Sequence, residues 1–174
     1  RFEAGELDSK AVQRVRFEDY AIHLGVPAEQ GTALNARYVE NLGQQAILLP
    51  GAMEMLETLS KRYKLAVATN GLTLVQRARL QKSGFLPLLG GVFISQEMGV
   101  QKPEKAYYDY IFNAFGDSDR AKYLMIGDSL SADIAGGVNA GIDTCWYRPV
   151  GAGEPHIRPT YTVDGFDALL RLLL

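Results

Sequence analysis

The chain has 174 residues, with 18 lysines and arginines against 20 aspartates and glutamates, so its formal net charge is −2. A protein that binds polyanions usually carries a clear basic excess, so we expect no binding to nucleic acid polymers. The single cysteine, Cys145, excludes an internal disulfide and favours a cytoplasmic setting. No apolar run approaches the roughly 20 residues of a membrane span, so we expect no membrane insertion.

The N-terminal part of the chain is predicted to be helical. Apolar residues recur at helical spacing between residues 9 and 24 and again between residues 34 and 42. Gly25 ends the first stretch and Gly43 ends the second. No strand pattern interrupts them, so we expect two helices before the pattern changes at Pro50.

From Pro50 onward, helices alternate with short apolar strands. The predicted strands are 64–69, 92–95, 123–126, 142–146 and 161–163. The predicted helices are 50–59, 74–82, 104–115, 132–140 and a leucine-rich helix at the end of the chain. This alternation predicts βαβ units and a parallel sheet, in which all strands have their carboxyl ends at one edge. Ligands of such sheets bind at that edge, so the residues after each strand are the candidates for chemistry.

Polar residues follow the first two of these strands. Thr69, Asn70 and Gly71 follow the first strand, where a hydroxyl and the neighbouring amides can donate to an anionic oxygen near a helix start. Lys102 comes seven residues after the end of the second strand and precedes Pro103, which suits the first turn of a helix. An ammonium held there would neutralise a phosphate. The ordinary alternatives are an incidental turn threonine and a solvated surface lysine.

Two carboxylates follow the third strand. Asp128 comes directly after the strand, and Asp133 lies in the first turn of the next helix. Mg²⁺ binds one or two carboxylates together with waters and a phosphate oxygen, so Asp128 is a candidate ligand. Asp133 would ligate through water or orient Asp128 and the waters. The ordinary alternatives are a turn residue for Asp128 and a helix-start carboxylate for Asp133.

These groups stand in the order Thr-Asn-Gly, Lys-Pro and Gly-Asp-Ser-x-x-x-Asp, each after its own strand. That order resembles the second, third and fourth motifs of the haloacid dehalogenase-like hydrolase superfamily. Residues 94–104 and 124–141 are similar to its pyrimidine nucleotidase (5'-nucleotidase) branch, and the resemblance covers Gly51–Trp146. It implies an α/β fold, with a Rossmann-like parallel sheet flanked by helices at 49–174 and part of a small helical cap at 1–48.

The resemblance also implies a Mg²⁺-dependent phosphatase that hydrolyses nucleoside 5'-monophosphates through an aspartyl-phosphate. Thr69–Gly71 and Lys102 would bind the phosphate, and Thr69 and Lys102 would be catalytic. Asp128 and Asp133 would hold Mg²⁺. The expected partner is a small phosphorylated metabolite, with a nucleotide in first place. The helical cap would close over the site and select the leaving group.

The family's first motif, Asp-x-Asp-x-Thr after a strand, has no counterpart in the chain. Asp117 and Asp119 lie in a loop after a predicted helix, and Glu18 and Asp19 lie within a helical pattern. In the family the corresponding strand is central and supplies the attacking aspartate. We therefore expect the first, central strand to be absent from this chain, the nucleophile to lie upstream of it, and the 174 residues alone to be inactive.

Two other functions agree with the same residues. A phosphosugar phosphatase or mutase of the same superfamily would use the same phosphate and metal groups, and its cap residues would set the difference in substrate. A catalytically inactive binding module would agree with the missing nucleophile.

Overall fold

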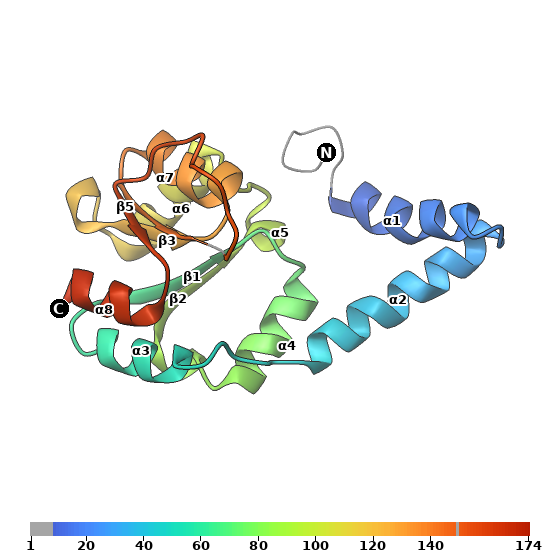
Figure 1. The fold of residues 1–174 in the computed structure, drawn as a ribbon, viewed down its shortest axis with the longest axis horizontal. Helices are drawn as coiled ribbons and strands as arrows, with labels where there is room; N and C mark the ends of the chain where they lie inside the picture. The colour runs from blue at the N-terminus through green and yellow to red at the C-terminus, as the bar shows by residue number, and fades with distance from the viewer. Residues whose placement is uncertain (1–8, 149) are drawn as a thin grey trace. The chain divides into compact units, whose positions relative to one another are not determined.

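The computed structural model describes residues 9–148 and 150–174 (Figure 1). These residues form two compact units. The first unit consists of the described residues up to Ala46 together with Leu74–Lys82, and the second consists of Ile47–Thr73 and Ser83–Leu174. All of the candidate residues that follow the predicted strands belong to the second unit, which therefore carries the candidate site.

The first unit contains the two N-terminal helices, α1 (Ser9–His23) and α2 (Ala28–Gln44). They approach each other so closely at Gly31 that any side chain there would overlap the backbone of Phe17. The Phe17 ring also packs on Tyr38, with the ring centroids 5.2 Å apart. The helical prediction for this part of the chain is confirmed for the described residues.

Five strands form the sheets of the second unit. They are β1 (Leu65–Thr69), β2 (Leu89–Ile94), β3 (Leu124–Gly127), β4 (Asp143–Tyr147) and β5 (Tyr161–Val163). β1 pairs with β2, and β4 lies between β3 and β5, with every pairing parallel. The parallel α/β fold predicted from the sequence is confirmed. Among the described residues no strand pairing joins β1 to β3, so each of these two strands keeps one edge without a partner strand.

Helices connect the strands (Figure 1). They are α3 (Ala52–Leu59), α4 (Thr73–Ser83), α5 (Ser95–Met98), α6 (Lys105–Phe115), α7 (Ala135–Ala140) and α8 (Phe166–Leu173), with short 3-10 turns at Leu86–Leu88 and Arg120–Lys122. None of the helices in the described part of the chain has both the length and the apolar character needed to cross a membrane. β2 begins at Leu89 rather than at residue 92, because Gly90 and Gly91 weaken the strand pattern in the sequence.

The helix predicted over 132–140 begins earlier and in a different form. Leu130–Ile134 make a π-helical turn, and α7 follows it directly. The carbonyl of Ser129 accepts hydrogen bonds from the amides of both Asp133 and Ile134, at 2.9 and 3.1 Å, which widens this first turn. The Ser129 side chain caps the same turn. The turn brings Asp133 back to the carboxyl end of β3.

The buried face of α6 packs on β2 and β3. One core cluster contains Phe93, Tyr107, Tyr108, Ile111, Phe112, Met125 and Ala140. The Tyr107 hydroxyl donates to the carbonyl of Phe93 at 2.7 Å, which satisfies a fully buried polar group. Burial raises the pKa of both Tyr107 and Tyr108, so both phenols stay neutral. The strand ends of the candidate site therefore rest on a packed aromatic core.

Candidate active site

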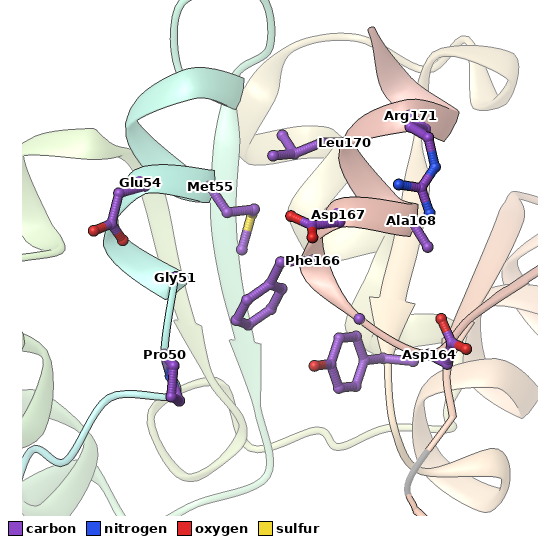
Figure 2. A pocket seen from close by; sticks show the side chains of 12 residues that line it. Pro50, Gly51, Glu54, Met55, Asp164, Phe166, Asp167, Ala168, Leu170 and Arg171 are labelled. Atoms are coloured by element: carbon purple, nitrogen blue, oxygen red, sulfur yellow. The ribbon is translucent and has the colours of Figure 1, made fainter.

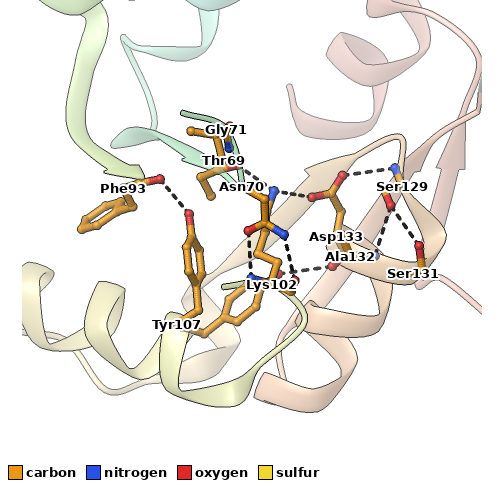
Figure 3. A network of polar contacts seen from close by, with 12 residues as sticks. Thr69, Asn70, Gly71, Phe93, Lys102, Tyr107, Ser129, Ser131, Ala132 and Asp133 are labelled. Atoms are coloured by element: carbon orange, nitrogen blue, oxygen red, sulfur yellow. Dashed lines mark hydrogen bonds and ion pairs between the residues drawn. The ribbon is translucent and has the colours of Figure 1, made fainter. Parts of the chain in front are cut away.

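Thr69 is the last residue of β1, at the strand's carboxyl end (Figure 3). Its hydroxyl oxygen accepts a hydrogen bond from the amide of Gly71 at 3.0 Å. A hydroxyl has one proton to donate besides its acceptor lone pairs, so this contact fixes the oxygen and leaves the proton for another acceptor. Thr69 is therefore suited to donate to an anionic oxygen beyond the end of the strand.

Lys102 is a buried cation, with only 7% of the residue exposed. Its Nζ donates to the carbonyl of Ala68 at 2.7 Å and to Oδ1 of Asp133 at 2.6 Å. The ammonium thus joins the end of β1 to the turn that follows β3. A charge taken out of water needs such partners, because an unpaired buried charge costs several kcal/mol. An ammonium has three N–H donors, so one remains for a ligand.

Asn70 connects β1 to the main chain of Lys102. Its Oδ1 accepts from the amide of Lys102 at 3.0 Å, and its Nδ2 donates to the carbonyl of the same residue at 2.8 Å. Both functional groups of the carboxamide are therefore used on one neighbour. The main-chain amide of Asn70, in contrast, follows Thr69 directly at the strand end.

Asp133 is a buried carboxylate whose two oxygens both have partners. Oδ1 accepts from Lys102, and Oδ2 accepts from the amide of Ser129 at 3.1 Å. Gly127, the last residue of β3, lies so close to this carboxylate that a Cβ there would overlap it. Glycine at the strand end is therefore required for Asp133 to take this position.

The surroundings of Asp128 are the opposite of those of the buried Asp133. It is exposed, and its side chain makes no hydrogen bond or ion pair with the rest of the described chain. Its main chain is fixed, because its carbonyl accepts from Nε1 of the buried Trp146 at 3.0 Å. Asp128 thus offers a free carboxylate on an anchored backbone at the end of β3.

The two aspartates fit a hard divalent cation in different ways. Mg²⁺ keeps several waters and takes only one or two protein carboxylates, so it does not need a cage of side chains. The described residues contain no group of three or more His, Cys, Asp or Glu side chains that would form such a cage. The exposed carboxylate of Asp128 fits a direct ligand, whereas Asp133, with both oxygens engaged, fits a support for the ligand and its waters.

Most of the residues predicted from the sequence come together at one place. Asn70, Lys102 and Asp133 belong to one polar network across the ends of β1 and β3 (Figure 3). Thr69 lies next to it at the end of β1, where its hydroxyl is bonded to the amide of Gly71. Asp128 stands beside the network in the chain but does not contact it through its side chain. Sequence reasoning missed Tyr108, whose hydroxyl donates to the carbonyl of Asp133 at 3.4 Å, because an aromatic on the apolar face of a helix has the pattern of a core residue.

A separate cavity of about 520 Å³ lies between α3 and α8 (Figure 2). Met55 and Phe166 lie between the two helices, and the acidic side chains Glu54, Asp164 and Asp167 line the cavity with one cation, Arg171. None of the predicted site residues lines it. Three carboxylates against one guanidinium disfavour a phosphate there, so the cavity is distinct from the candidate phosphate site.

The profile of the haloacid dehalogenase-like hydrolases matches residues 6–141. The chain belongs to this family. The resemblance inferred from the three motifs is thereby confirmed, and the parallel α/β fold agrees with it.

Two of the proteins that are similar to this chain are pyrimidine 5'-nucleotidases. PynA of Streptococcus pneumoniae is 40% identical over 173 residues, which cover 98% of this chain and 73% of PynA. YjjG of Escherichia coli is 36% identical over 173 residues, which cover 99% of this chain and 76% of YjjG. Among solved structures, the HAD-hydrolase YfnB of Bacillus subtilis bound to magnesium is similar with a TM-score of 0.91 and 35% identity, over 99% of this chain and 75% of YfnB.

Proposed function

We propose that this chain carries the phosphate-binding and metal-binding residues of a Mg²⁺-dependent phosphatase that acts on nucleoside 5'-monophosphates, with pyrimidine nucleotides in first place. The observation that carries the proposal is the buried Lys102 ammonium, held by Ala68 and Asp133 across the ends of β1 and β3. The pyrimidine 5'-nucleotidases PynA and YjjG, which are similar over nearly the whole chain, support the nucleotide as substrate.

In this proposal the residues of the chain supply the electrostatic part of the reaction. A carboxylate that attacks a phosphate dianion meets repulsion between negative charges. The third N–H of Lys102 donates to the phosphate and offsets this repulsion. The Thr69 hydroxyl and the main-chain amide of Asn70 donate to other phosphate oxygens. Mg²⁺, when bound at Asp128, supplies further positive charge beside the phosphate. Asp133 keeps Lys102 in place.

The attacking carboxylate, in the same proposal, comes from outside the 174 residues. None of the described strands ends in the sequence Asp-x-Asp. The free edges of β1 and β3 support a further parallel strand between them, as the family resemblance implies. An aspartate at the end of such a strand would form the aspartyl-phosphate, which water then hydrolyses.

Two further parts of the proposal concern the cap and the cellular location. Residues 1–48 would form part of a cap that excludes water and selects the leaving group, and the compact helical unit of α1 and α2 supports this role. A cytoplasmic location agrees with the buried and unpaired Cys145.

The test is a hydrolysis assay of the complete natural protein with Mg²⁺. Release of inorganic phosphate is measured for pyrimidine and purine nucleoside 5'-monophosphates and for sugar phosphates. We expect the highest kcat/KM for a pyrimidine nucleotide, and a loss of about 100-fold or more in the Lys102→Met variant. A sugar phosphate as the best substrate would contradict the nucleotide assignment, and undiminished turnover by Lys102→Met would contradict the site.

A further inference from the structure

The carboxamide of Asn70 binds the main chain of Lys102 in the way a neighbouring strand would. It accepts from the Lys102 amide at 3.0 Å and donates to the Lys102 carbonyl at 2.8 Å. In an antiparallel sheet the opposite residue of a hydrogen-bonded pair makes the same two kinds of bond. Since both ends of the carboxamide are engaged, the side chain of Asn70 acts on Lys102 and not on a ligand.

Lys102 depends on this contact because it lies in an irregular segment. The segment runs from the end of α5 at Met98 to the start of α6 at Lys105. Its local main-chain bonds join Gly99 to Ser95 and Glu104 to Gln101, which leaves the main chain of Lys102 to Asn70. A lysine on a loose segment would not keep its ammonium at one point.

A second asparagine holds the neighbouring residue and provides a matched control. Nδ2 of Asn139 donates to the carbonyl of Pro103 at 3.1 Å. This contact is also made by a carboxamide to the main chain of the segment, but it does not involve Lys102. Asn139 is exposed and has no place in the candidate site.

We propose that Asn70 is a positioning residue that fixes the main chain of Lys102, so that the ammonium reaches both Ala68 and Asp133 and presents its third N–H to the phosphate. The catalytic part of this proposal rests on the proposed phosphatase function. Asn70 thereby has two separate tasks, because its main-chain amide lies at the phosphate site while its side chain holds the cation. The spacing of Asn70 and Lys102 in the sequence gives no sign of this link.

The test compares Asn70→Ala, Asn70→Asp and Asn139→Ala in the complete natural protein. The first readout is the rate at which an amine-acylating reagent modifies Lys102, followed by mass spectrometry. The second readout is the split between kcat and KM for nucleotide hydrolysis. Asn70→Asp keeps an acceptor for the Lys102 amide but loses the donor to its carbonyl, so it tests the contact with little change in volume.

In Asn70→Ala we expect the reagent to acylate Lys102 about tenfold faster and kcat to fall about tenfold, because two hydrogen bonds are lost. KM should change much less for Asn70→Ala. Asn70→Asp should change the acylation rate at least as much as Asn70→Ala, because a carboxylate oxygen then faces the Lys102 carbonyl oxygen in place of a donor. Asn139→Ala should lower Tm without changing either readout. If Asn70→Ala does not fold, the Asp variant gives the result on its own.

Two results would overturn the proposal. One is a Lys102 acylation rate in both Asn70 variants equal to that of the wild type, and the other is an equal effect of Asn139→Ala on acylation and kcat. If the wild-type protein hydrolyses neither nucleoside 5'-monophosphates nor sugar phosphates, the proposed function is wrong. The acylation rates would still decide whether Asn70 positions Lys102.

Discussion

Asp128 and Asp133 lie five positions apart and are expected to behave in opposite ways when neutralised. Asp128 is exposed and its carboxylate has no partner among the described residues, whereas Asp133 is 6% exposed and both of its oxygens accept hydrogen bonds. Asp128 therefore has the surroundings of a metal ligand, and Asp133 has those of a residue that supports the ligand and its waters. Replacing each aspartate by asparagine removes the charge with almost no change in shape, so the two variants form a matched pair.

The Asp128→Asn variant should lose most of the Mg²⁺-dependent activity while keeping its stability. A bound metal ion is worth several kcal/mol in the transition state, so we expect a loss of roughly 100-fold or more. The exposed position predicts a change in the free energy of unfolding within about 0.5 kcal/mol. The measurement is turnover against Mg²⁺ concentration. Full turnover by this variant in the presence of a chelator would rule out Asp128 as a metal ligand.

The Asp133→Asn variant should be strongly destabilised. It leaves the buried ammonium of Lys102 without a negative partner, and breaking a buried ion pair costs about 3–5 kcal/mol. Urea unfolding of this variant and of Asp128→Asn under the same conditions measures the difference. Equal stability of the two variants would show that the ion pair does not hold the site together.

At the scale of elements, α7 lies on the sheet at a distance that only glycine allows. A Cβ at Gly137 would overlap Cγ2 of the buried Thr144 on β4. A Cβ at Gly136 would overlap the Tyr108 ring of α6. The π-helical turn before α7 and the two glycines therefore set where Asp133 lies.

The Gly137→Ala variant tests this packing. Alanine favours helices, but the overlap with a fixed side chain should outweigh that gain and destabilise the protein by about 1–3 kcal/mol. Gly153→Ala is the control, because nothing lies within 4 Å of a Cβ there and its backbone suits other residues. The midpoint of denaturant unfolding reports the difference. A Gly137→Ala variant as stable as the control would contradict the close packing of α7.

In the described part of the chain, β1 and β3 each keep one edge without a partner strand, and such edges lower stability where their main-chain groups are buried. Buried amides and carbonyls without partners cost about 1–3 kcal/mol each, against a total stability of about 5–15 kcal/mol. We therefore expect residues 1–174 on their own to melt at a lower temperature than the complete natural protein. They should also fail to hydrolyse p-nitrophenyl phosphate with Mg²⁺. A cooperative melt at the same temperature, together with turnover, would contradict the missing strand and nucleophile.

The sequence predicted the strands and their parallel arrangement because each strand is a short apolar run between turn residues. It also predicted which residues follow the strands, since that depends on chain order alone. It did not reveal the pairing of Lys102 with Asp133 or with Asn70, because these residues are about thirty positions apart and meet only through tertiary structure. The sequence also did not reveal the π-helical turn, because this turn depends on the Ser129 carbonyl, which accepts hydrogen bonds from two amides.

A crystal structure of the complete natural protein with inorganic phosphate and Mg²⁺ would show directly where phosphate binds. If the ends of β1 and β3 form the phosphate site, a phosphate oxygen will lie within hydrogen-bond distance of both the Thr69 hydroxyl and the Lys102 ammonium. Mg²⁺ will then lie on the carboxylate of Asp128. Phosphate bound elsewhere, for example in the cavity between α3 and α8, without contact to Thr69 or Lys102, would contradict a phosphate site at these strand ends.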